Sequence, residues 1–565
     1  MHNLRNIHKY ILILAITVIL AYLLPGCLWV SPVTTGPGNE VEEPPSESPE
    51  DEARRRQEER QRRNEELKQE LGQFYVPLPP LDQPENPPVT VKALYLTGHT
   101  VGYRDRYAAN LKLIEDTELN AVVIDVKDDH GKMSYRSDIE IVNQINAYYQ
   151  PVPISDIREV LAELKSKNIY PIARIVVFKD PYLANAKPEW AIQANQGGVW
   201  TEKGVAWINP FQEEVWDYNI AIAKEAALLG FREIQFDYIR FPENARRVDQ
   251  EAYYPGQNGR IKDDAVKGFL QRARQQLADY NVYFACDVFG VIATSWGDTD
   301  QIGQIWETFA PEIDYQCPMV YPSHYGPGYF GYPVPDAEPA GTITHALTDA
   351  LKRNAPLKQP AVIRPWLQSF TATWIRGYIP YGAYEVRQQI DAALALGIEE
   401  YMIWDPSNVY PPGAFLTEEE AGRRAKEISE NREAQGRDHL NRTAEQAVNC
   451  YLQAVKQKDW REAYSLQGSS KQLSGDQYRE WLTGSTGNLN RWQIKSLENS
   501  GEGWLLNLEI LISSGGEELQ LPDEKWSVIK ENNLWRVKPS SRFVKYISGE
   551  QNGQQEVSPG KGNKE

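Results

Sequence analysis

Between residues 91 and 433 the chain alternates short apolar runs with longer amphipathic stretches. The apolar runs are continuous rather than alternating with polar positions, which is typical of strands buried on both faces of a parallel sheet. Each run is followed by a loop and then by a helical pattern. The expected strands are residues 91–97, 121–127, 170–178, 233–241, 282–290, 313–321, 361–368 and 400–406.

The stretches between these strands predict helices, most clearly over residues 154–168, 210–230 and 264–280. A last helix is expected over residues 417–433, with Thr417 as its N-cap ahead of Glu420. Eight strand–helix units predict a (β/α)8 TIM barrel over residues 89–434. A doubly wound sheet would suit fewer strands, and it would carry a Gly-rich phosphate turn after its first strand, which the segment LYLTGHTVGYRDR lacks.

Residues 1–27 predict an export signal. A basic start precedes an apolar run over residues 11–24, which is shorter than the roughly 20 residues of a membrane-spanning helix. The sequence Leu24-Pro25-Gly26-Cys27 resembles a bacterial lipobox, in which Cys27 would be lipidated and become the mature N-terminus. An uncleaved anchor or an ordinary secretory signal is the alternative. In each case the bulk of the chain is expected outside the cytoplasm.

Residues 28–88 have the composition of a tether. Pro, Gly, Ser and Glu dominate residues 31–50, and a dense mixed-charge stretch at 51–71 predicts a solvated helix before a Pro-rich exit. The arginines of this stretch could bind an anionic cell wall. A stiff spacer that holds a domain away from a membrane is the favoured interpretation.

Overall composition excludes some functions and leaves others open. The chain of 565 residues carries 60 basic and 78 acidic side chains, a formal net charge of −18, which argues against nucleic-acid binding through phosphates. The 16 Trp and 31 Tyr can fill a large core, but aromatic side chains also stack on sugar faces. Composition alone does not decide between these two uses.

Polar and aromatic residues collect at the carboxyl ends of the expected strands, where TIM barrels have their active sites. Paired carboxylates with nearby aromatic side chains are the equipment of glycoside cleavage. Each aromatic side chain could equally serve in core packing. The candidates at these strand ends are Asp125, Asp237, Arg240, Asp287, Tyr321, His324, Arg364, Trp366, Trp404 and Asp405.

Asp237 interrupts an apolar strand in QFDYIRFP, where an unpaired carboxylate would be costly to bury. Arg240 is expected to pair with it and to keep it ionised, which suits a nucleophile. A buried structural ion pair at the top of the barrel is the alternative.

Asp287 has apolar neighbours in ACDVFG and no adjacent base, so burial is expected to raise the pKa of its carboxyl group, as a general acid requires. Asp405 and Asp125 compete for this acid role, although substrate binding or transition-state stabilisation suits them better.

Other chemistries have weaker support. The chain has no GxSxG and no HExxH motif, and no cofactor or metal site is expected. Asp128, Asp129 and His130 are consecutive and do not share a face, so a solvated loop is favoured over a metal site. Cys286 and Cys317 lie in apolar runs and are expected to be inert core thiols.

The segments VKALYLTGHTVG, NAVVIDVKDDHGKMSY, ARIVVFKDP, EIQFDYIRFP, FACDVFG, PMVYPSHY and WDPSN carry a family resemblance. From Val91 to about Pro412 the chain resembles the bacterial putative glycosyl hydrolase domain family, distantly related to the α-amylase and α-galactosidase superfamilies. The resemblance implies a TIM barrel and glycoside hydrolysis, with the strand-4 aspartate, Asp237, as nucleophile. The α-amylase acid is typically Glu after strand 5, where this chain has Asp287, so the acid assignment stays open.

After residue 435 the pattern changes to two or three helices followed by antiparallel strands with turns between them. Residues 440–548 resemble a nuclear-transport-factor-2-like cone, with a protein- or glycan-binding accessory role slightly favoured over a spacer. The tail at 549–565 is expected to be disordered.

Together these features predict a glycoside hydrolase, lipid-anchored at the cell membrane and facing the extracellular side. Its substrate would be a polysaccharide or oligosaccharide, cleaved by retention with Asp237 as nucleophile and Asp287 as acid/base. Two alternatives are a non-catalytic glycan-binding surface lipoprotein with the same cleft and a structural lipoprotein of the envelope.

Overall fold

A computed structural model describes residues 49–548, except residues 296, 356, 358, 441, 468–472, 502 and 515–516. The expected export signal, the lipidation site at Cys27 and the tail at 549–565 lie outside the described residues. The mixed-charge stretch forms helix α2 (Pro49–Leu71), as expected. Within it, Arg62 pairs with Glu66 one turn later at 3.2 Å, an exposed contact of the kind that supports a solvated helix.

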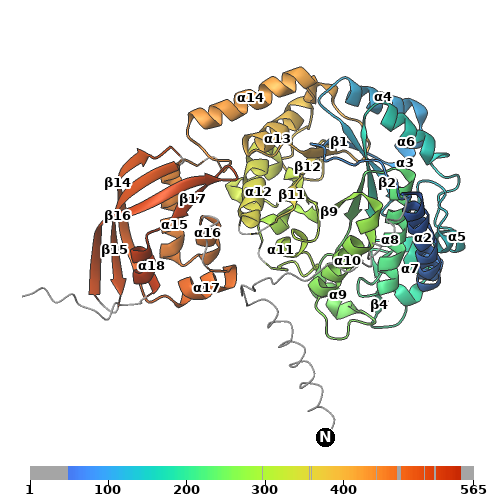
Figure 1. The fold of residues 1–565 in the computed structure, drawn as a ribbon, viewed down its shortest axis with the longest axis horizontal. Coiled ribbons are helices and arrows are strands. Elements are labelled where there is room, and N and C mark those ends of the chain that lie inside the picture. Colours follow the sequence, from blue (N-terminus) through green and yellow to red (C-terminus); the bar gives the residue numbers. More distant parts are fainter. Residues whose placement is uncertain are drawn as a thin grey trace, which may run out of the picture. The chain divides into compact units, whose positions relative to one another are not determined.

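Parallel strands close into a barrel, which confirms the predicted fold class (Figure 1). β1 pairs with both β2 and β13, and β9 pairs with β10, so the sheet has no free edge. The strands are β1 (Lys92–Leu96), β2 (Ala121–Lys127), β3 (Tyr170–Val176), β7 (Glu233–Asp237), β9 (Tyr283–Phe289), β10 (Tyr315–Met319), β11 (Val362–Ile363), β12 (Trp366–Gln368) and β13 (Tyr401–Trp404).

β11 and β12 are the two halves of the expected seventh strand. The strand is interrupted at Arg364 and Pro365, because proline has no backbone N–H to donate to a neighbouring strand. β11 pairs with β10, whereas β12 pairs with both β10 and β13. The barrel therefore has eight strand positions, the number that the sequence pattern predicts.

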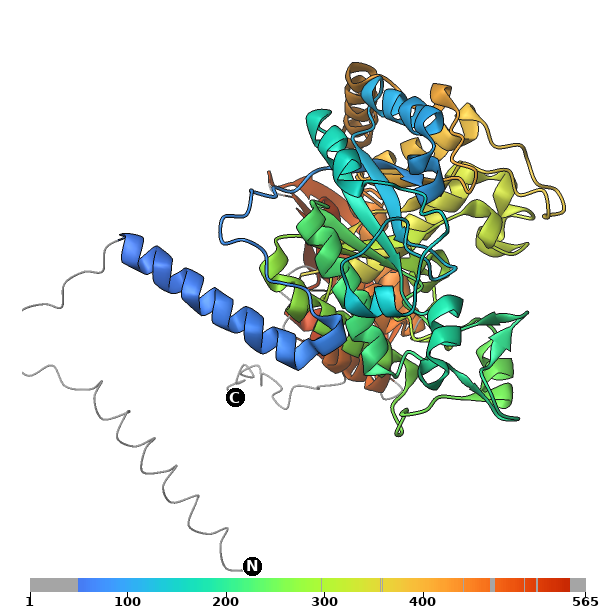
Figure 2. The ribbon, with the colours of Figure 1, turned by 90° about the vertical axis from the view of Figure 1, so that its right-hand side faces the viewer.

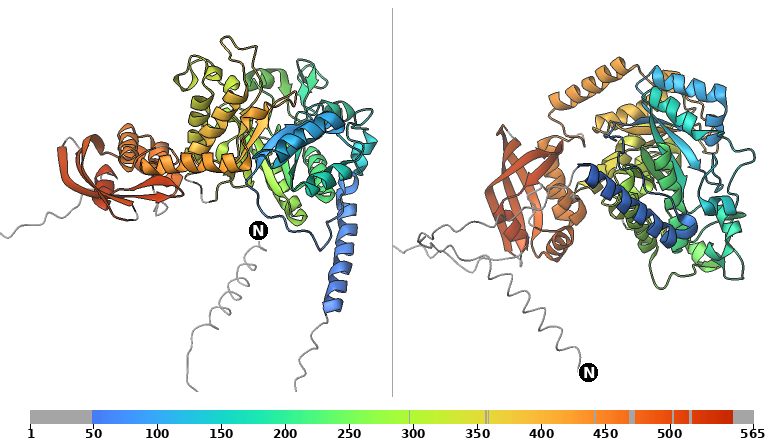
Figure 3. Two further views of the ribbon diagram at one scale, coloured as in Figure 1. Left: turned by 90° about the horizontal axis from the view of Figure 1, so that it is seen from above. Right: turned by 45° about the vertical axis from the view of Figure 1, so that its right-hand side comes forward.

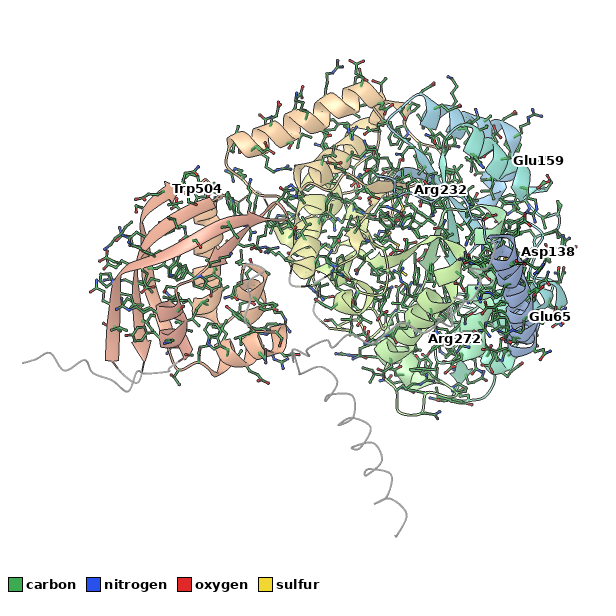
Figure 4. The ribbon with its side chains drawn as sticks, viewed as in Figure 1. Glu65, Asp138, Glu159, Arg232, Arg272 and Trp504 are labelled. Carbon is green, nitrogen blue, oxygen red and sulfur yellow. The ribbon has the colours of Figure 1, made fainter. Side chains whose placement is uncertain are left out.

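Helices surround the barrel, and their charged side chains, such as Arg272 of α10, lie on the outer surface (Figure 4). Arg272 pairs with Asp217 of α8 at 2.7 Å, which ties two neighbouring helices together. The longer helices are α4 (Arg104–Glu115), α6 (Ile157–Ser166), α8 (Glu213–Leu229), α10 (Lys262–Leu277), α12 (Pro339–Asn354), α13 (Ala383–Ala395) and α14 (Glu418–Ala434). Shorter ones are α3 (Gly98–Gly102), α5 (Glu140–Gln144), α7 (Pro181–Ala186), α9 (Ala245–Glu251) and α11 (Trp306–Phe309).

The predicted N-cap of α14 is confirmed. The Thr417 hydroxyl accepts a hydrogen bond from the Glu420 backbone N–H at 3.3 Å, and the Glu420 carboxylate accepts one from the Thr417 N–H at 3.1 Å. This reciprocal pair is a capping box. Both backbone donors at the start of the helix are thereby satisfied.

Long segments follow β3, β10 and β12, and in Figure 2 they project to one side of the barrel (teal, yellow-green and gold). The first contains the short strands β4 (Gln193–Ala194), β5 (Thr201–Glu202) and β6 (Val205–Ala206), and β4 pairs with β8 (Ala252–Tyr253) from the segment after β7. Because these segments follow the carboxyl ends of the strands, they surround the end of the barrel where active sites form.

The apolar residues of the barrel pack in two buried clusters, one of which contains Cys286 and the other Cys317. Both cysteines are fully buried free thiols, as expected. Burial raises the pKa of both thiols well above its ordinary value, so they stay protonated and inert.

Residues 444–548 form an antiparallel sheet with helices against one face (Figure 3). The expected order of helices first and strands afterwards is observed, and the likeness to a nuclear-transport-factor-2-like cone stays a prediction. The elements are α15 (Ala444–Gln457), α16 (Trp460–Ser465), α17 (Gly475–Gly484), β14 (Asn488–Asn499), β15 (Gly503–Ser514), β16 (Glu517–Glu531), β17 (Leu534–Lys538) and α18 (Ser541–Ser548). Among the described residues, no helix is both long enough and apolar enough to span a membrane.

Candidate active site

A cavity of about 890 Å³ opens at the carboxyl ends of the barrel strands. Its walls come from β3, β7, β9, β10, β12 and β13 and from the segments after β7, β9, β10 and β12. Seven of the residues predicted from the sequence line it, namely Asp237, Arg240, Asp287, Tyr321, His324, Trp366 and Trp404. The predicted convergence of acids and aromatic side chains at this end of the barrel is therefore observed.

Arg174 is the cation at the centre of this site. Its Nη1 lies 2.5 Å from Oδ1 of Asp125, and its Nε and Nη2 lie 3.1 and 2.5 Å from Oδ2 of Asp237. All three side chains are almost fully buried. One guanidinium thus balances two carboxylates inside the barrel, and charge-assisted bonds of this kind fix the geometry of both acids.

The expected pairing of Asp237 with Arg240 is wrong. β7 ends at Asp237 rather than at residue 241, and Tyr238 has a positive φ of 52°, an unusual backbone for a bulky side chain that turns the chain away. Arg240 pairs instead with Glu243 at 3.0 Å. Its guanidinium also lies over the ring of Phe289, 4.3 Å from the centroid, so Arg240 is part of the cavity wall.

Asp287 has a longer ionic contact than Asp125 and Asp237, because Nε of Arg174 lies 4.0 Å from its Oδ2. Its Oδ1 accepts hydrogen bonds from Gln235 Nε2 at 2.9 Å and from Trp366 Nε1 at 2.7 Å. Burial, and next the charge of Asp237, raise the pKa of Asp287 well above its usual value, as expected from the sequence. A carboxyl group that stays protonated near neutral pH can donate a proton to a leaving group.

Asp237 and Asp287 face the same cavity and the same arginine. Nε of Arg174 lies 3.1 Å from Oδ2 of Asp237 and 4.0 Å from Oδ2 of Asp287, which places these two oxygens within about 7 Å of each other. Retaining glycosidases have carboxyl groups about 5–5.5 Å apart, and inverting ones about 6.5–9.5 Å. This upper limit admits the retaining separation and excludes the wide end of the inverting range.

Asp125 lies behind Asp237 rather than on the cavity wall. Its Oδ2 accepts a hydrogen bond from the Tyr95 hydroxyl at 2.5 Å. Burial raises the pKa of Asp125 to about 6, although Arg174 opposes the shift. Tyr95 in turn stacks on Trp404, with ring centroids 4.0 Å apart. Asp125 is therefore placed to position Arg174.

Aromatic side chains line one wall of the cavity. Tyr321 contacts both His324 and Phe370 edge to face, with ring centroids 5.2 and 5.8 Å apart. Burial lowers the pKa of His324, which keeps the imidazole neutral. Trp366 is almost fully buried and donates a hydrogen bond to Asp287. It therefore positions the Asp287 carboxyl group and leaves little ring surface on which a sugar could stack. Trp404 is partly exposed and presents more of its ring.

Two predicted contacts lie elsewhere. Arg364 is fully buried and bonds Glu233, the first residue of β7, at 2.6 Å and Glu400, just before β13, at 2.7 Å. It therefore lies at the amino end of the barrel. The Asp405 carboxylate closes a turn by accepting a hydrogen bond from the Ser407 backbone N–H at 2.7 Å. Neither Arg364 nor Asp405 is among the described residues that line the cavity. The expected placement of Arg364 at the carboxyl end is wrong, whereas Asp405 follows β13 as expected and its contact with substrate stays a prediction.

Three residues of the site were missed from the sequence: Arg174, Gln235 and Tyr95. Arg174 and Gln235 are polar residues inside otherwise apolar strands, and this is the same signal that identified Asp237. The strand register places Arg174 beside both Asp125 and Gln235. Reading polar residues within the strands, as well as at their ends, would have found them.

No group of three or more His, Cys, Asp or Glu side chains suited to a metal ion occurs within the part of the chain that the structure describes. In the segment after β2, Asp129 pairs with Lys179 at 2.7 Å, and Asp128 accepts a hydrogen bond from the Tyr149 hydroxyl. These acids therefore have protein partners.

Several solved structures are similar to this chain. A hypothetical protein from Ruminiclostridium thermocellum ATCC 27405 is 40% identical, with 34% of this chain and 97% of that chain covered and a TM-score of 0.32. The glycoside hydrolase domain of PgaB (BpsB) from Bordetella bronchiseptica is 13% identical, with 57% and 95% covered and a TM-score of 0.41. The alpha-L-fucosidase isoenzyme 2 from Paenibacillus thiaminolyticus is 16% identical, with 61% and 50% covered and a TM-score of 0.38.

A search of curated proteins finds no match. The model of the family described as "Putative glycosyl hydrolase domain" matches residues 93–410, which is more than half of the chain and includes the whole set of barrel strands except the first residue of β1. The resemblance noted in the sequence is thereby confirmed, and the chain belongs to this glycosyl hydrolase domain family.

Proposed function

We propose that this protein is a glycoside hydrolase that cleaves glycosidic bonds in an extracellular or cell-envelope polysaccharide, with retention of configuration. The family implies a carbohydrate substrate. The observation that carries the proposal is the pair of acids on one cavity: Asp237, held by a guanidinium, and Asp287, which is buried and accepts two hydrogen bonds and whose pKa burial raises. Two carboxyl groups in opposite environments match the division of roles in glycoside cleavage.

In the first step Asp237 attacks the anomeric carbon, and the glycosidic C–O bond breaks as Asp287 gives its proton to the leaving oxygen. Because Oδ1 of Asp287 accepts from Gln235 and Trp366, its Oδ2 carries the proton. In the second step water attacks the same carbon, gives a proton back to Asp287 and releases Asp237. Arg174 stabilises the carboxylate of Asp237 before and after the covalent intermediate.

Aromatic residues of the cavity lining supply sugar contacts in this proposal. The partly exposed Trp404 offers apolar ring surface, the largely buried Tyr321 offers only an edge, and His324 offers a neutral hydrogen-bonding side chain. Arg240, which also lines the cavity, can donate to sugar hydroxyl groups. The geometry leaves the identity of the sugar open.

The test is a hydrolysis screen across cell-envelope and plant glycans with the wild type and Asp237→Asn. Loss of the attacking carboxylate is expected to lower kcat by roughly 10⁴-fold or more, with the folded state retained because asparagine has the same shape. Proton NMR of the first product formed then reports the anomeric configuration. An Asp237→Asn variant with wild-type activity would rule out the nucleophile, and an inverted product would rule out retention.

One observation favours a second candidate, glycan binding without turnover. Both oxygens of Asp237 are engaged, Oδ2 with Arg174 and Oδ1 with the Tyr238 backbone N–H at 2.6 Å. A carboxylate held this way could serve only to shape a binding cleft. Saturable binding of a glycan by the wild type, with no product released, would favour this candidate.

The same proposal includes anchoring to the outer face of the cell membrane through Cys27, for which the sequence LPGC is the support. Labelled palmitate should appear in the wild-type protein and not in Cys27→Ser, and the variant should be released into the medium. Equal labelling of both proteins would contradict lipidation at Cys27.

A further inference from the structure

An exposed aromatic side chain continues the wall of the cavity. Trp374 is 67% exposed, the one tryptophan among the exposed large hydrophobic side chains of the described residues. Its ring stacks on Phe370 with an interplanar angle of 18° and centroids 6.0 Å apart. Phe370 itself lines the cavity and contacts Tyr321 and His324. A row of rings therefore runs from the catalytic end of the barrel to solvent.

The loop that carries these rings, residues 369–382, is braced at both ends. The Phe370 carbonyl oxygen accepts a hydrogen bond from the buried Gln368 side chain at 3.0 Å. The Tyr381 backbone N–H donates to the Thr371 hydroxyl at 3.0 Å, and the Tyr381 hydroxyl donates to the Asp336 carbonyl oxygen at 3.0 Å. A ring presented from a braced loop loses less conformational freedom when a ligand binds.

Packing does not account for Trp374. Two-thirds of its surface is in water, and leaving a large apolar ring there is unfavourable. The electron-rich face of an aromatic ring attracts weakly positive hydrogens, and the C–H bonds of a pyranose ring present such hydrogens on one face. The cavity also has a finite size: about 890 Å³ encloses a ligand of drug-like size, so a longer glycan must continue over the rim.

We propose that Trp374 and Phe370 form a sugar-binding platform outside the cavity, which holds a further ring of the same glycan chain that is cleaved at Asp237 and Asp287. This inference rests on the proposed function and deepens it. The substrate is a chain of several sugar units, and the platform adds affinity for the chain while the carboxylates cleave it.

The first test compares two substrates of the same sugar, the polysaccharide cleaved best by the wild type and the matching 4-nitrophenyl monoglycoside. Trp374→Ala is expected to raise KM for the polymer by roughly 2- to 10-fold, the worth of one aromatic contact. The monoglycoside does not reach the platform, so its kcat and KM should stay unchanged. Trp374→Phe, which keeps a ring, should recover most of the affinity for the polymer.

Tyr384 of α13 is the matched control, because it is 69% exposed and lies outside the cavity lining. Tyr384→Ala should leave both substrates unaffected. An unchanged KM for the polymer in Trp374→Ala, equal losses on both substrates, or the same loss in Tyr384→Ala would each overturn the platform while leaving the proposed hydrolysis intact.

A binding measurement separates the two proposals when hydrolysis itself is missing. Sedimentation of the full chain with insoluble chitin, xylan and peptidoglycan needs no turnover. If the wild type binds one of them without cleaving it, the proposed hydrolysis fails, and weaker binding by Trp374→Ala still supports the platform. Equal binding by the variant, or no binding of any of the three by the wild type, overturns it.

Discussion

Two buried arginines, one at each end of the barrel, are each shared by two carboxylates. At the carboxyl end Arg174 bonds Asp125 and Asp237. At the amino end Arg364 bonds Glu233 and Glu400, at 2.6 and 2.7 Å, and lies 3.6 Å from the centre of the Tyr315 ring. By charge and by hydrogen bonding the two clusters are close equivalents.

What differs is their surroundings. Arg174 and Asp237 line the cavity together with a third acid, Asp287, whose pKa burial raises well above its ordinary value. Arg364 is fully buried, and it is not among the residues described as lining a cavity. Buried ion pairs alone are therefore poor markers of a site, whereas an ion pair beside an open volume and a further acid with a raised pKa indicates chemistry.

A large effect is expected from a change at Asp287, the third acid at the carboxyl end of the barrel. Asp287→Asn keeps the shape of the side chain and an oxygen for Gln235 and Trp366, but it removes the proton donor. Activity is expected to fall roughly 10²- to 10⁴-fold. Because burial raises the pKa of Asp287, the protonated form persists as the pH rises and is lost only when the pH passes that raised pKa.

The pH profile of kcat/KM checks this assignment. The wild type should lose activity on the alkaline side as Asp287 ionises, and that limb should be missing from Asp287→Asn. A limb that persists at the same pH in the variant would assign the acid role to another group.

A smaller effect is expected at the amino end, and it should appear in stability rather than in activity. Arg364→Met leaves Glu233 and Glu400 without their cation, and breaking such a buried pair costs roughly 3–5 kcal/mol. The measurement is the denaturant midpoint of the two proteins. The conservative variant Arg364→Lys should retain part of the stability because it keeps the positive charge.

The protonation of Glu233 determines how the stability difference between the wild type and Arg364→Met changes with pH. Burial raises the pKa of Glu233 to about 7 even with Arg364 present, so the carboxyl group is neutral at lower pH and then needs no cation. Arg364 lowers the pKa of Glu233, so that pKa is higher still in Arg364→Met. The destabilisation should therefore shrink as the pH falls toward about 7 and level off below it. A loss of stability that grows on acidification would contradict this account.

The barrel was predictable because its signal is repeated. Eight continuous apolar runs each require burial on both faces, so an error in one boundary leaves the architecture unchanged. The expected strand 233–241 shows the limit, because β7 ends at Asp237, where the chain turns at Tyr238. A single residue with positive φ leaves no mark in the hydrophobic pattern.

The site was predictable in part for the same reason. Asp237 and Asp287 stand out because a carboxyl group within an apolar strand requires a special environment. Their partners did not follow from nearness along the chain: Arg240 is three residues from Asp237, yet Arg174 of the neighbouring strand bonds it. Arg364 fits the same polar pattern but lies toward the opposite end of the barrel, because it precedes β12, the half of the seventh strand that reaches the cavity.

The measurement that tests the central claim most directly is kcat/KM per folded molecule for Asp237→Asn and Arg364→Met, side by side on the best glycan substrate. The account predicts that Asp237→Asn stays folded and loses nearly all activity, whereas Arg364→Met is less stable but has wild-type activity per folded molecule. Wild-type activity in Asp237→Asn, or an equal loss per folded molecule in both variants, would contradict it.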